Sequence, residues 1–310
     1  MLSRACAAAL ALSFVLAAGP AHGAGGPLPI VTTTTDLKAL VEAVGGDRVA
    51  VESLAPPLVD PHAVEVKPGQ LARLRDAALL VRIGLDHEPW LRRALATVGD
   101  AGPTLGGPRD LDASRGVALL QTETPRLRED RATPHLHGFG NPHYWLDPEN
   151  ARPITAAIQA ALTRLSSADR ERFEDNRRRF LERLAAGLAR WQAALAPQRG
   201  ARLVAMHDTW PYFAARFGLT IAATVEPTPG VPPSPVALGA LVEQMRAAGV
   251  RVLVAEPYAS AALVRQVADK SGGRAVTLVP SVGGDAGAGD YLAMFDLNVR
   301  RLADALAAAR

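Results

Sequence analysis

The chain has one cysteine among its 310 residues, Cys6, and that cysteine lies near the amino terminus. Without a second thiol no disulfide can form within the chain, so stability has to come from a large core. No apolar run reaches the length of about 20 residues that a transmembrane helix needs. No basic block with interleaved aromatic residues occurs either, and the formal net charge is only +3. These absences argue against an integral membrane protein and against a nucleic-acid-binding protein.

The first 24 residues are typical of a secretory signal peptide. Arg4 supplies a positive charge, residues 7–18 form an apolar run interrupted only by Ser13, and small residues follow up to Ala24. We expect cleavage after Gly23 or Ala24 and export of the mature chain. Cleavage would remove Cys6, so a metal site in the mature protein could not use sulfur. Roughly 285 residues would remain, which at about 100–200 residues per domain predicts one large or two medium domains.

Short apolar runs alternate with amphipathic stretches in both halves of the mature chain. The runs expected to form strands are 29–33, 49–54, 78–83, 202–206, 219–225, 250–255 and 275–279. The stretches expected to form helices are 37–44, 68–75, 89–98, 210–217, 234–248, 261–270 and 291–308. This alternation predicts an α/β protein whose parallel sheets are flanked by helices.

A stretch with helical periodicity and no proline separates the two halves, at 171–195, and Ser167 is its expected N-cap. At about 1.5 Å per residue such a helix spans most of a domain, which indicates a rigid strut between two lobes. The predicted organisation is a signal peptide at 1–24, an N-terminal α/β lobe at 25–165, a linking helix at 166–197 and a C-terminal α/β lobe at 198–310. Residues 117–142 lack periodicity and predict a long exposed loop.

Six of the seven histidines follow the expected signal peptide, at strand ends or in loops. His62 and His207 each follow a predicted strand, and His143 ends the long loop. Ligands of open α/β sheets bind at the carboxyl ends of strands, so these three could converge on one zinc ion between the lobes. Asp290 could supply a fourth ligand. Solvated loop histidines are an equally good interpretation of the spacing alone, and Asp290 could instead cap the last helix.

Several motifs occur in order along nearly the whole mature chain. They are Asp60-Pro61-His62 with Lys67-Pro68, Gly84-Leu85 with Glu88-Pro89-Trp90-Leu91, Asn141-Pro142-His143-Tyr144-Trp145-Leu146-Asp147-Pro148, Met206-His207-Asp208 with Tyr212-Phe213, Pro233-Ser234-Pro235, Glu256-Pro257, and Asn298 with Leu302 and Leu306. In this order they resemble the zinc/manganese class of substrate-binding proteins of bacterial ABC importers.

The resemblance implies a two-lobed fold with one long rigid helix joining the lobes and the metal in the cleft between them. It places the first three ligands at His62, His143 and His207. Manganese members often have a glutamate at the third position, and manganese prefers oxygen ligands, so His207 favours zinc. Many members place an aspartate two residues before the tyrosine of the last helix, where this chain has Gly289. The fourth ligand would then be Asp290, one residue further along.

The function that the resemblance implies is capture of zinc in the periplasm with high affinity and delivery to the membrane permease of an ABC importer. The protein would be a monomer and not an enzyme, and a periplasmic zinc chaperone is a further candidate partner. A manganese- or iron-binding importer component is the first alternative. A secreted zinc hydrolase is the second, although the chain has no His-Glu-x-x-His motif, and three histidines with an aspartate leave no open position for a catalytic water.

Five other residues are candidates for supporting roles. The loop histidines His135 and His137 form either a weak auxiliary metal site or part of a solvated loop. We expect His87 to have a structural role or to support the ligands from outside the coordination shell. Asp147 and Asp208 could orient the ligand histidines through hydrogen bonds, although Asp147 is equally suited to capping a helix before Pro148.

Overall fold

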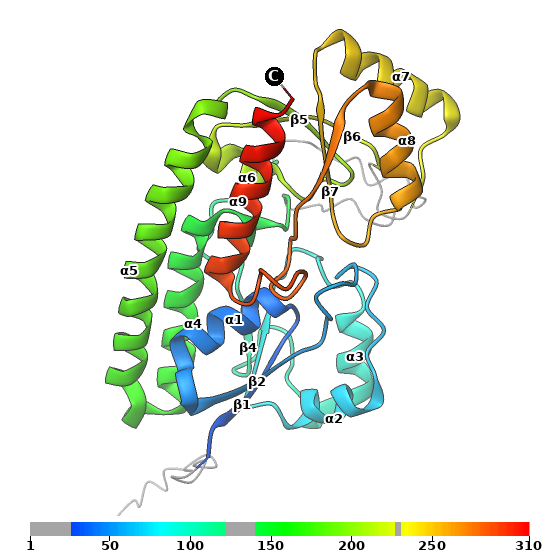
Figure 1. Cartoon of the computed structure of the whole chain (residues 1–310). Helices are drawn as coiled ribbons and strands as arrows, with labels where there is room; N and C mark the ends of the chain where they lie inside the picture. Colours follow the sequence, from blue (N-terminus) through cyan, green and yellow to red (C-terminus); the bar gives the residue numbers. More distant parts are fainter. Residues whose placement is uncertain (1–25, 122–139, 227–230, 310) are drawn as a thin grey trace, which may run out of the picture.

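The computed structural model describes residues 26–121, 140–226 and 231–309. Within these ranges the chain forms two α/β lobes, one above the other in Figure 1, with a long helix running beside both. The fold class predicted from the sequence is therefore confirmed. The expected signal peptide and the pair His135 and His137 lie outside the described residues. Among the described residues no helix is both long and apolar enough to cross a bilayer.

The N-terminal lobe is built on a parallel four-stranded sheet in the order β2-β1-β3-β4. Its strands are β1 (Leu28–Thr32), β2 (Val49–Ser53), β3 (Leu79–Arg82) and β4 (Asp110–Asp112). Its helices are α1 (Thr35–Gly45), α2 (Pro68–Asp76), α3 (Leu91–Val98) and α4 (Ala151–Leu165). Two of these elements were not predicted from the sequence: β4, whose only apolar residue is Leu111, and α4, which buries Ile154, Ile158 and Leu162 against the neighbouring helices.

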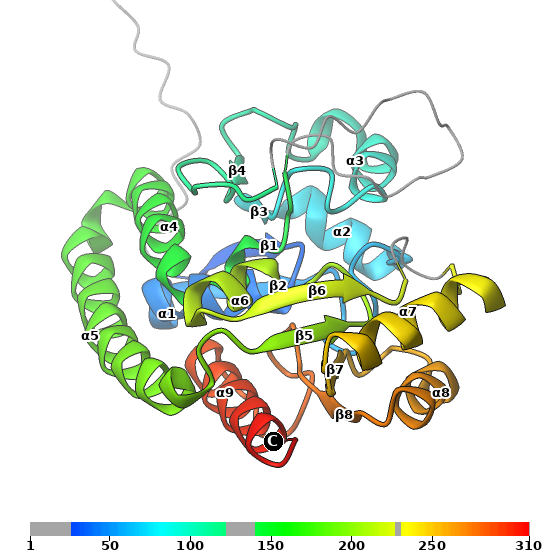
Figure 2. The ribbon, with the colours of Figure 1, turned by 90° about the horizontal axis from the view of Figure 1, so that it is seen from above.

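The C-terminal lobe repeats this plan with a second parallel sheet in the order β6-β5-β7-β8. Its strands are β5 (Arg202–Ala205), β6 (Thr220–Thr224), β7 (Val252–Ala255) and β8 (Arg274–Thr277). Its helices are α6 (Pro211–Phe217), α7 (Pro235–Ala247), α8 (Ala261–Ser271) and α9 (Tyr291–Ala307). Seen from above in Figure 2, α7 and α8 lie at one side of this sheet, and α9 lies at the opposite side, near α5.

The long helix α5 (Arg170–Leu195) ties the two lobes together. It packs against α1 and α4 of the first lobe and against α9, which follows the second sheet in the chain. Its buried face includes Phe180 and Trp191, and Nε1 of Trp191 donates to the carboxylate of Asp296 in α9 at 2.7 Å. Ser167 is not the N-cap, because a single 3-10 turn, Ser167–Asp169, precedes the α-helix.

Asp36 forms a second connection between the lobes. It lies in the first turn of α1, and its Oδ1 accepts a hydrogen bond from the backbone N–H of Val282, which lies between β8 and α9, at 3.0 Å. The side chain is buried, and burial raises the pKa of this carboxyl from 3.8 to about 7, against the opposing effect of the Val282 hydrogen bond. The contact thus fixes the last connection of the chain to the first helix.

Candidate metal centre

Three histidines of the N-terminal lobe lie together: His62, His87 and His143. Each contributes one ring nitrogen to a group whose atoms all lie within 4.8 Å of one another. The ring centroids are 4.3 Å apart for His62 and His87, 5.4 Å for His87 and His143, and 5.6 Å for His62 and His143. Zinc–nitrogen bonds of about 2.0–2.1 Å place the nitrogens of a tetrahedral site roughly 3.3 Å apart. Small ring movements would therefore close the group around an ion.

Hydrogen bonds define which nitrogen of His62 and His143 carries the proton. Nδ1 of His62 lies 2.9 Å from the backbone carbonyl oxygen of His87, and Nδ1 of His143 lies 3.0 Å from Oδ1 of Asn141. Both oxygens can only accept, so each Nδ1 donates and the ring lone pair is on Nε2. This is the tautomer in which an imidazole binds a metal through Nε2 while its other nitrogen is held in place.

The side-chain amide of Asn141 has a defined orientation. Its Oδ1 also accepts from the backbone N–H of His143 at 2.9 Å, and its Nδ2 donates to the backbone carbonyl of Asp208 at 2.8 Å. Oδ2 of Asp208 lies 3.2 Å from the same Nδ2. Asp208 is therefore linked to His143 through Asn141. Because Asp208 follows β5, this chain of bonds also joins the two lobes beside the histidines.

The loop that presents His62 is fixed by two further hydrogen bonds. Oδ1 of Asp60 accepts from the backbone N–H of His62 at 2.9 Å, which closes a turn two residues long. Nε1 of Trp90 donates to the carbonyl of Pro61 at 2.8 Å. The Asp-Pro-His motif therefore acts through its aspartate as well as its histidine, because Asp60 sets the backbone from which the ring projects.

His87 follows an unusual turn after β3. Gly84, Leu85 and Asp86 have backbone φ angles of 79°, 56° and 57°, three consecutive residues in the left-handed region. Glycine adopts a positive φ without strain, and a Cβ at Gly84 would also lie only 2.4 Å from Oδ1 of Asp112. The other two residues adopt this conformation at a cost of roughly 1–2 kcal/mol each. The turn directs the His87 ring inward, where the side chain is completely buried.

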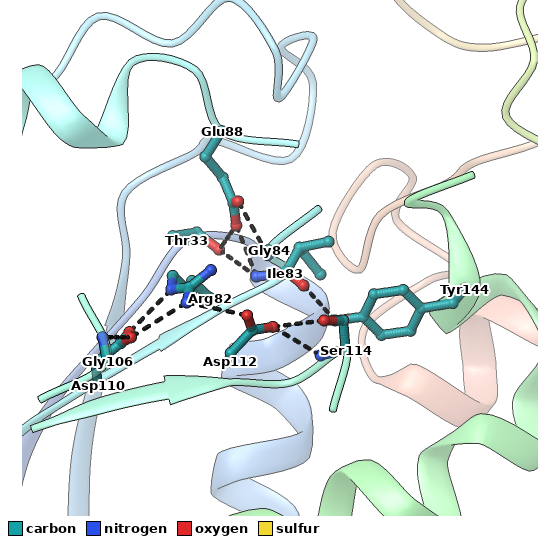
Figure 3. Close-up of polar contacts among 10 residues, drawn as sticks. All are labelled: Thr33, Arg82, Ile83, Gly84, Glu88, Gly106, Asp110, Asp112, Ser114 and Tyr144. Carbon is teal, nitrogen blue, oxygen red and sulfur yellow. Dashed lines mark hydrogen bonds and ion pairs between the residues drawn. The ribbon is translucent and has the colours of Figure 1, made fainter. Parts of the chain in front are cut away.

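Glu88 holds this turn from within the lobe, as Figure 3 shows. Its Oε1 accepts from Oγ1 of Thr33 and from the backbone N–H of Ile83, both at 2.6 Å, and its Oε2 accepts from the N–H of Gly84 at 3.1 Å. Burial raises the pKa of Glu88 to about 7, although all three hydrogen bonds oppose the shift. Tyr144, beside His143, donates from its hydroxyl to the carbonyl of Ile83 at 2.7 Å. Ile83 therefore connects the His87 turn, through Glu88, to the His143 loop, through Tyr144.

His207 lies in the other lobe, after β5, and is not a member of the three-histidine group. Its Nδ1 is 3.6 Å from Oε2 of Glu226, and its Nε2 is 4.0 Å from Oε2 of Glu256. Its ring stacks on that of Tyr258 with 6.3 Å between centroids. Burial raises the pKa of Glu256, whose Oε1 accepts from Nε1 of Trp210 at 2.8 Å. Each glutamate closely follows a strand of the parallel sheet, and Glu256 belongs to the Glu256-Pro257 motif.

Asp290 is not a member of the three-histidine group. Its Oδ1 accepts from the backbone N–H of Ala293 at 2.8 Å, which makes it the N-cap of α9, and its Oδ2 lies 3.4 Å from Nη2 of Arg183 in α5. The capping interpretation is therefore confirmed, whereas a fourth ligand at Asp290 stays a prediction. The shift by one residue relative to Gly289 puts the carboxylate where the first turn of the helix needs an acceptor.

The structure also places Asp147 and His87. Asp147 takes the capping role that the sequence offered: its Oδ1 accepts from the N–H of Glu149 at 3.0 Å, and its two oxygens pair with the guanidinium of Arg216 at 2.6 and 2.7 Å. It is a cap and an ion-pair partner. His87, predicted as a supporting residue, contributes one of the three nitrogens that converge in the first lobe. The strained turn that brings it there has no recognisable sequence signature.

Comparison with known proteins identifies the family of the chain. The family described as "ZnuA: Zinc-uptake complex component A periplasmic" matches residues 30–305. A protein of Paracoccus denitrificans called "High-affinity zinc uptake system protein ZnuA" is 29% identical, over 90% of this chain and 92% of its own length. A "Putative metal-binding protein" of Treponema pallidum is 27% identical, over 81% of this chain and 78% of its own length.

The fold is also similar to that of solved structures. "Crystal structure of ZnuA" superposes with a TM-score of 0.76 at 25% identity, covering 90% of this chain and 99% of that one. A manganese-bound periplasmic metal-binding protein of Candidatus Liberibacter asiaticus has the same fold, with a TM-score of 0.73 at 19% identity, covering 89% of this chain and 98% of that one. Because the family match spans nearly the whole chain, the protein belongs to the periplasmic zinc-uptake component A family.

Proposed function

We propose that this member of the periplasmic zinc-uptake component A family captures zinc with high affinity and delivers it to the membrane permease of an ABC importer. The observation that carries the proposal is the pair His62 and His143, because Nδ1 of each faces an oxygen acceptor and the ring lone pair is therefore on Nε2, the tautomer in which an imidazole binds a metal. Relatives named as high-affinity zinc uptake proteins support zinc as the cargo.

The proposed binding site takes His62 and His143 from the first lobe and His207 from the second. The hydrogen bonds from Asn141 to Asp208 support this arrangement, because they hold the residue next to His207 beside the His143 loop. In the present structure His207 lies close to Glu226 and Glu256 of its own lobe. Ligation would replace these contacts, and either glutamate is near enough to His207 to support its ring from outside the coordination shell.

Imidazole ligands favour zinc over manganese. Neutral nitrogen donors suit zinc, whereas manganese binds preferentially to carboxylate, carbonyl and water oxygens. Among the described residues the group that converges in the first lobe contains only histidines. The site therefore has the donor chemistry of a zinc-binding protein, and manganese or iron is the less suitable cargo.

The protein acts by binding and release without chemical change of its cargo, as a monomer in the periplasm. The organisation proposed for the mature chain is an N-terminal lobe at 25–165, a linking helix at 166–197 and a C-terminal lobe at 198–310, after removal of the signal peptide at 1–24. The packing of α5 against α1, α4 and α9 supports a stiff connection between the lobes.

Isothermal titration of metal-free protein tests the proposal. We expect one zinc ion to bind per chain and manganese to bind much more weakly under the same conditions. A zinc titration that releases no heat, or equal affinities for zinc and manganese, would contradict the assignment of zinc as the cargo.

A further inference from the structure

We propose that His87 binds the zinc ion directly, so that the N-terminal lobe alone supplies three imidazole ligands. The inference rests on the proposed zinc-binding function and deepens it, because it adds a ligand to the site and places most of the coordination shell in one lobe. Three independent observations carry it: the convergence of the rings, the strained turn before His87 and the chemistry of the buried side chain.

The geometry of the rings is the first observation. The ligand atoms of His62, His87 and His143 all lie within 4.8 Å of one another. The planes of the rings are inclined at 72°, 84° and 78° in the pairs His62–His87, His87–His143 and His62–His143. The rings therefore meet edge to face and do not stack, and a modest rotation of each brings three nitrogens to one point. His87 is at the centre of this group, with the shortest two centroid distances.

The turn before His87 is the second observation. Leu85 and Asp86 both adopt left-handed backbone conformations, which cost energy for residues other than glycine. Such conformations persist where the surroundings determine them, and they cluster at functional sites. Here Glu88 imposes the conformation through its hydrogen bonds to Thr33, Ile83 and Gly84. The lobe thus uses a buried carboxyl group to position one imidazole.

The polarity of the buried ring is the third observation. His87 is completely buried, and its ring centroid is 4.3 Å from that of His62 and 5.1 Å from that of Trp145. Buried polar groups need partners for their polar atoms, and a metal ion is a partner that a buried imidazole can take. The rings of His62 and His143 lie around His87, so an ion bound to either of them would lie close to the His87 ring. Coordination of a metal is therefore a role that fits the chemistry of this side chain.

The consequence for the site is a division of the ligands between the lobes. With His87 as a ligand, three nitrogens come from one lobe, and His207 of the second lobe completes the tetrahedral shell that a closed zinc site requires. Loss of the His207 ligand would then leave an ion still held by three imidazoles. The first lobe would therefore supply most of the coordination shell.

The test uses X-ray absorption at the zinc edge together with competition titration on the mature protein. In wild type we expect four imidazoles around one zinc. His87→Phe keeps an aromatic ring against Trp145 but removes the nitrogen, so we expect one imidazole fewer and an affinity lower by at least about 100-fold, the upper end of the loss caused by altering a residue that supports a ligand. His207→Ala should also lose one imidazole yet still bind zinc.

The outcomes separate the inference from the function on which it rests. A His87→Phe protein with wild-type affinity and an unchanged imidazole count would overturn the inference and leave zinc binding intact, whereas wild type that binds no zinc would overturn the proposed function. If His87→Phe does not fold, nitrogen-15 spectra of the histidine rings of wild type decide the matter. We expect zinc to shift one ring nitrogen of His87 as it does those of His62 and His143, and a His87 ring unaffected by zinc would refute the inference.

Discussion

Asn141→Ala should weaken zinc binding without unfolding the protein. Asn141 is not one of the proposed zinc ligands, but its Oδ1 accepts hydrogen bonds from Nδ1 and from the backbone N–H of His143, at 3.0 and 2.9 Å. Without the amide, the His143 ring is no longer held in one orientation, and its proton is no longer fixed on Nδ1. Loss of such a partner lowers metal affinity by about 10- to 100-fold. This corresponds to about 1.4–2.7 kcal/mol of binding free energy.

The assay is competition with a chromophoric zinc chelator at a pH where the histidines are neutral. Asn150→Ala is the matched control, because Nδ2 of Asn150 donates to the carbonyl of Tyr144 at 2.8 Å in the same loop without contacting a candidate ligand. We expect the control to bind zinc as wild type does. If Asn141→Ala binds zinc within twofold of wild type while its circular dichroism is unchanged, the assignment of the His143 tautomer is refuted.

Three further predictions concern protonation and capping. Zinc affinity should fall as the pH drops below about 6.5, because each histidine must be neutral to bind the ion, and a competition titration that gives the same affinity at each pH would exclude histidine ligands. Asp290→Ala should lower the free energy of unfolding by about 1 kcal/mol through loss of the α9 cap, with zinc affinity unchanged; weaker zinc binding would restore Asp290 as a ligand. Burial raises the pKa of Asp36 to about 7, so the native metal-free protein holds this proton more tightly than the unfolded chain. The free energy of unfolding should therefore fall between about pH 4 and 7, by up to roughly 1.4 kcal/mol per pH unit. Urea titrations of Asp36→Asn should lack this component, and an equal decline in both proteins would contradict the raised pKa of Asp36.

Regular patterning explains why much of the fold could be predicted from the sequence. Apolar runs such as 250–255 and amphipathic stretches such as 261–270 record which residues face the core, and β7 and α8 lie within a few residues of those ranges. The strand β4 could not be found in this way, because Asp-Leu-Asp at a sheet edge has almost no apolar pattern. Its position depends on pairing with β3 and on the ion pairs of Asp110 and Asp112 with Arg82.

The metal centre was only partly predictable for a similar reason. His62, His143 and His207 follow strands or motifs, so their approximate positions could be inferred from topology. His87 depends on a turn with three consecutive left-handed residues, which sequence does not reveal when two of them are Leu85 and Asp86. Asp290 presented the opposite difficulty, since an aspartate before a helix has the same sequence signature whether it caps the helix or binds a metal.

The most direct test of the central claim is an anomalous difference map at the zinc edge from crystals of the zinc-loaded mature protein. The account predicts one strong peak about 2.0–2.1 Å from Nε2 of His62 and Nε2 of His143, on the side of the first lobe that faces His207. A map without a peak at these nitrogens, or with the strong peak elsewhere in the chain, would contradict it.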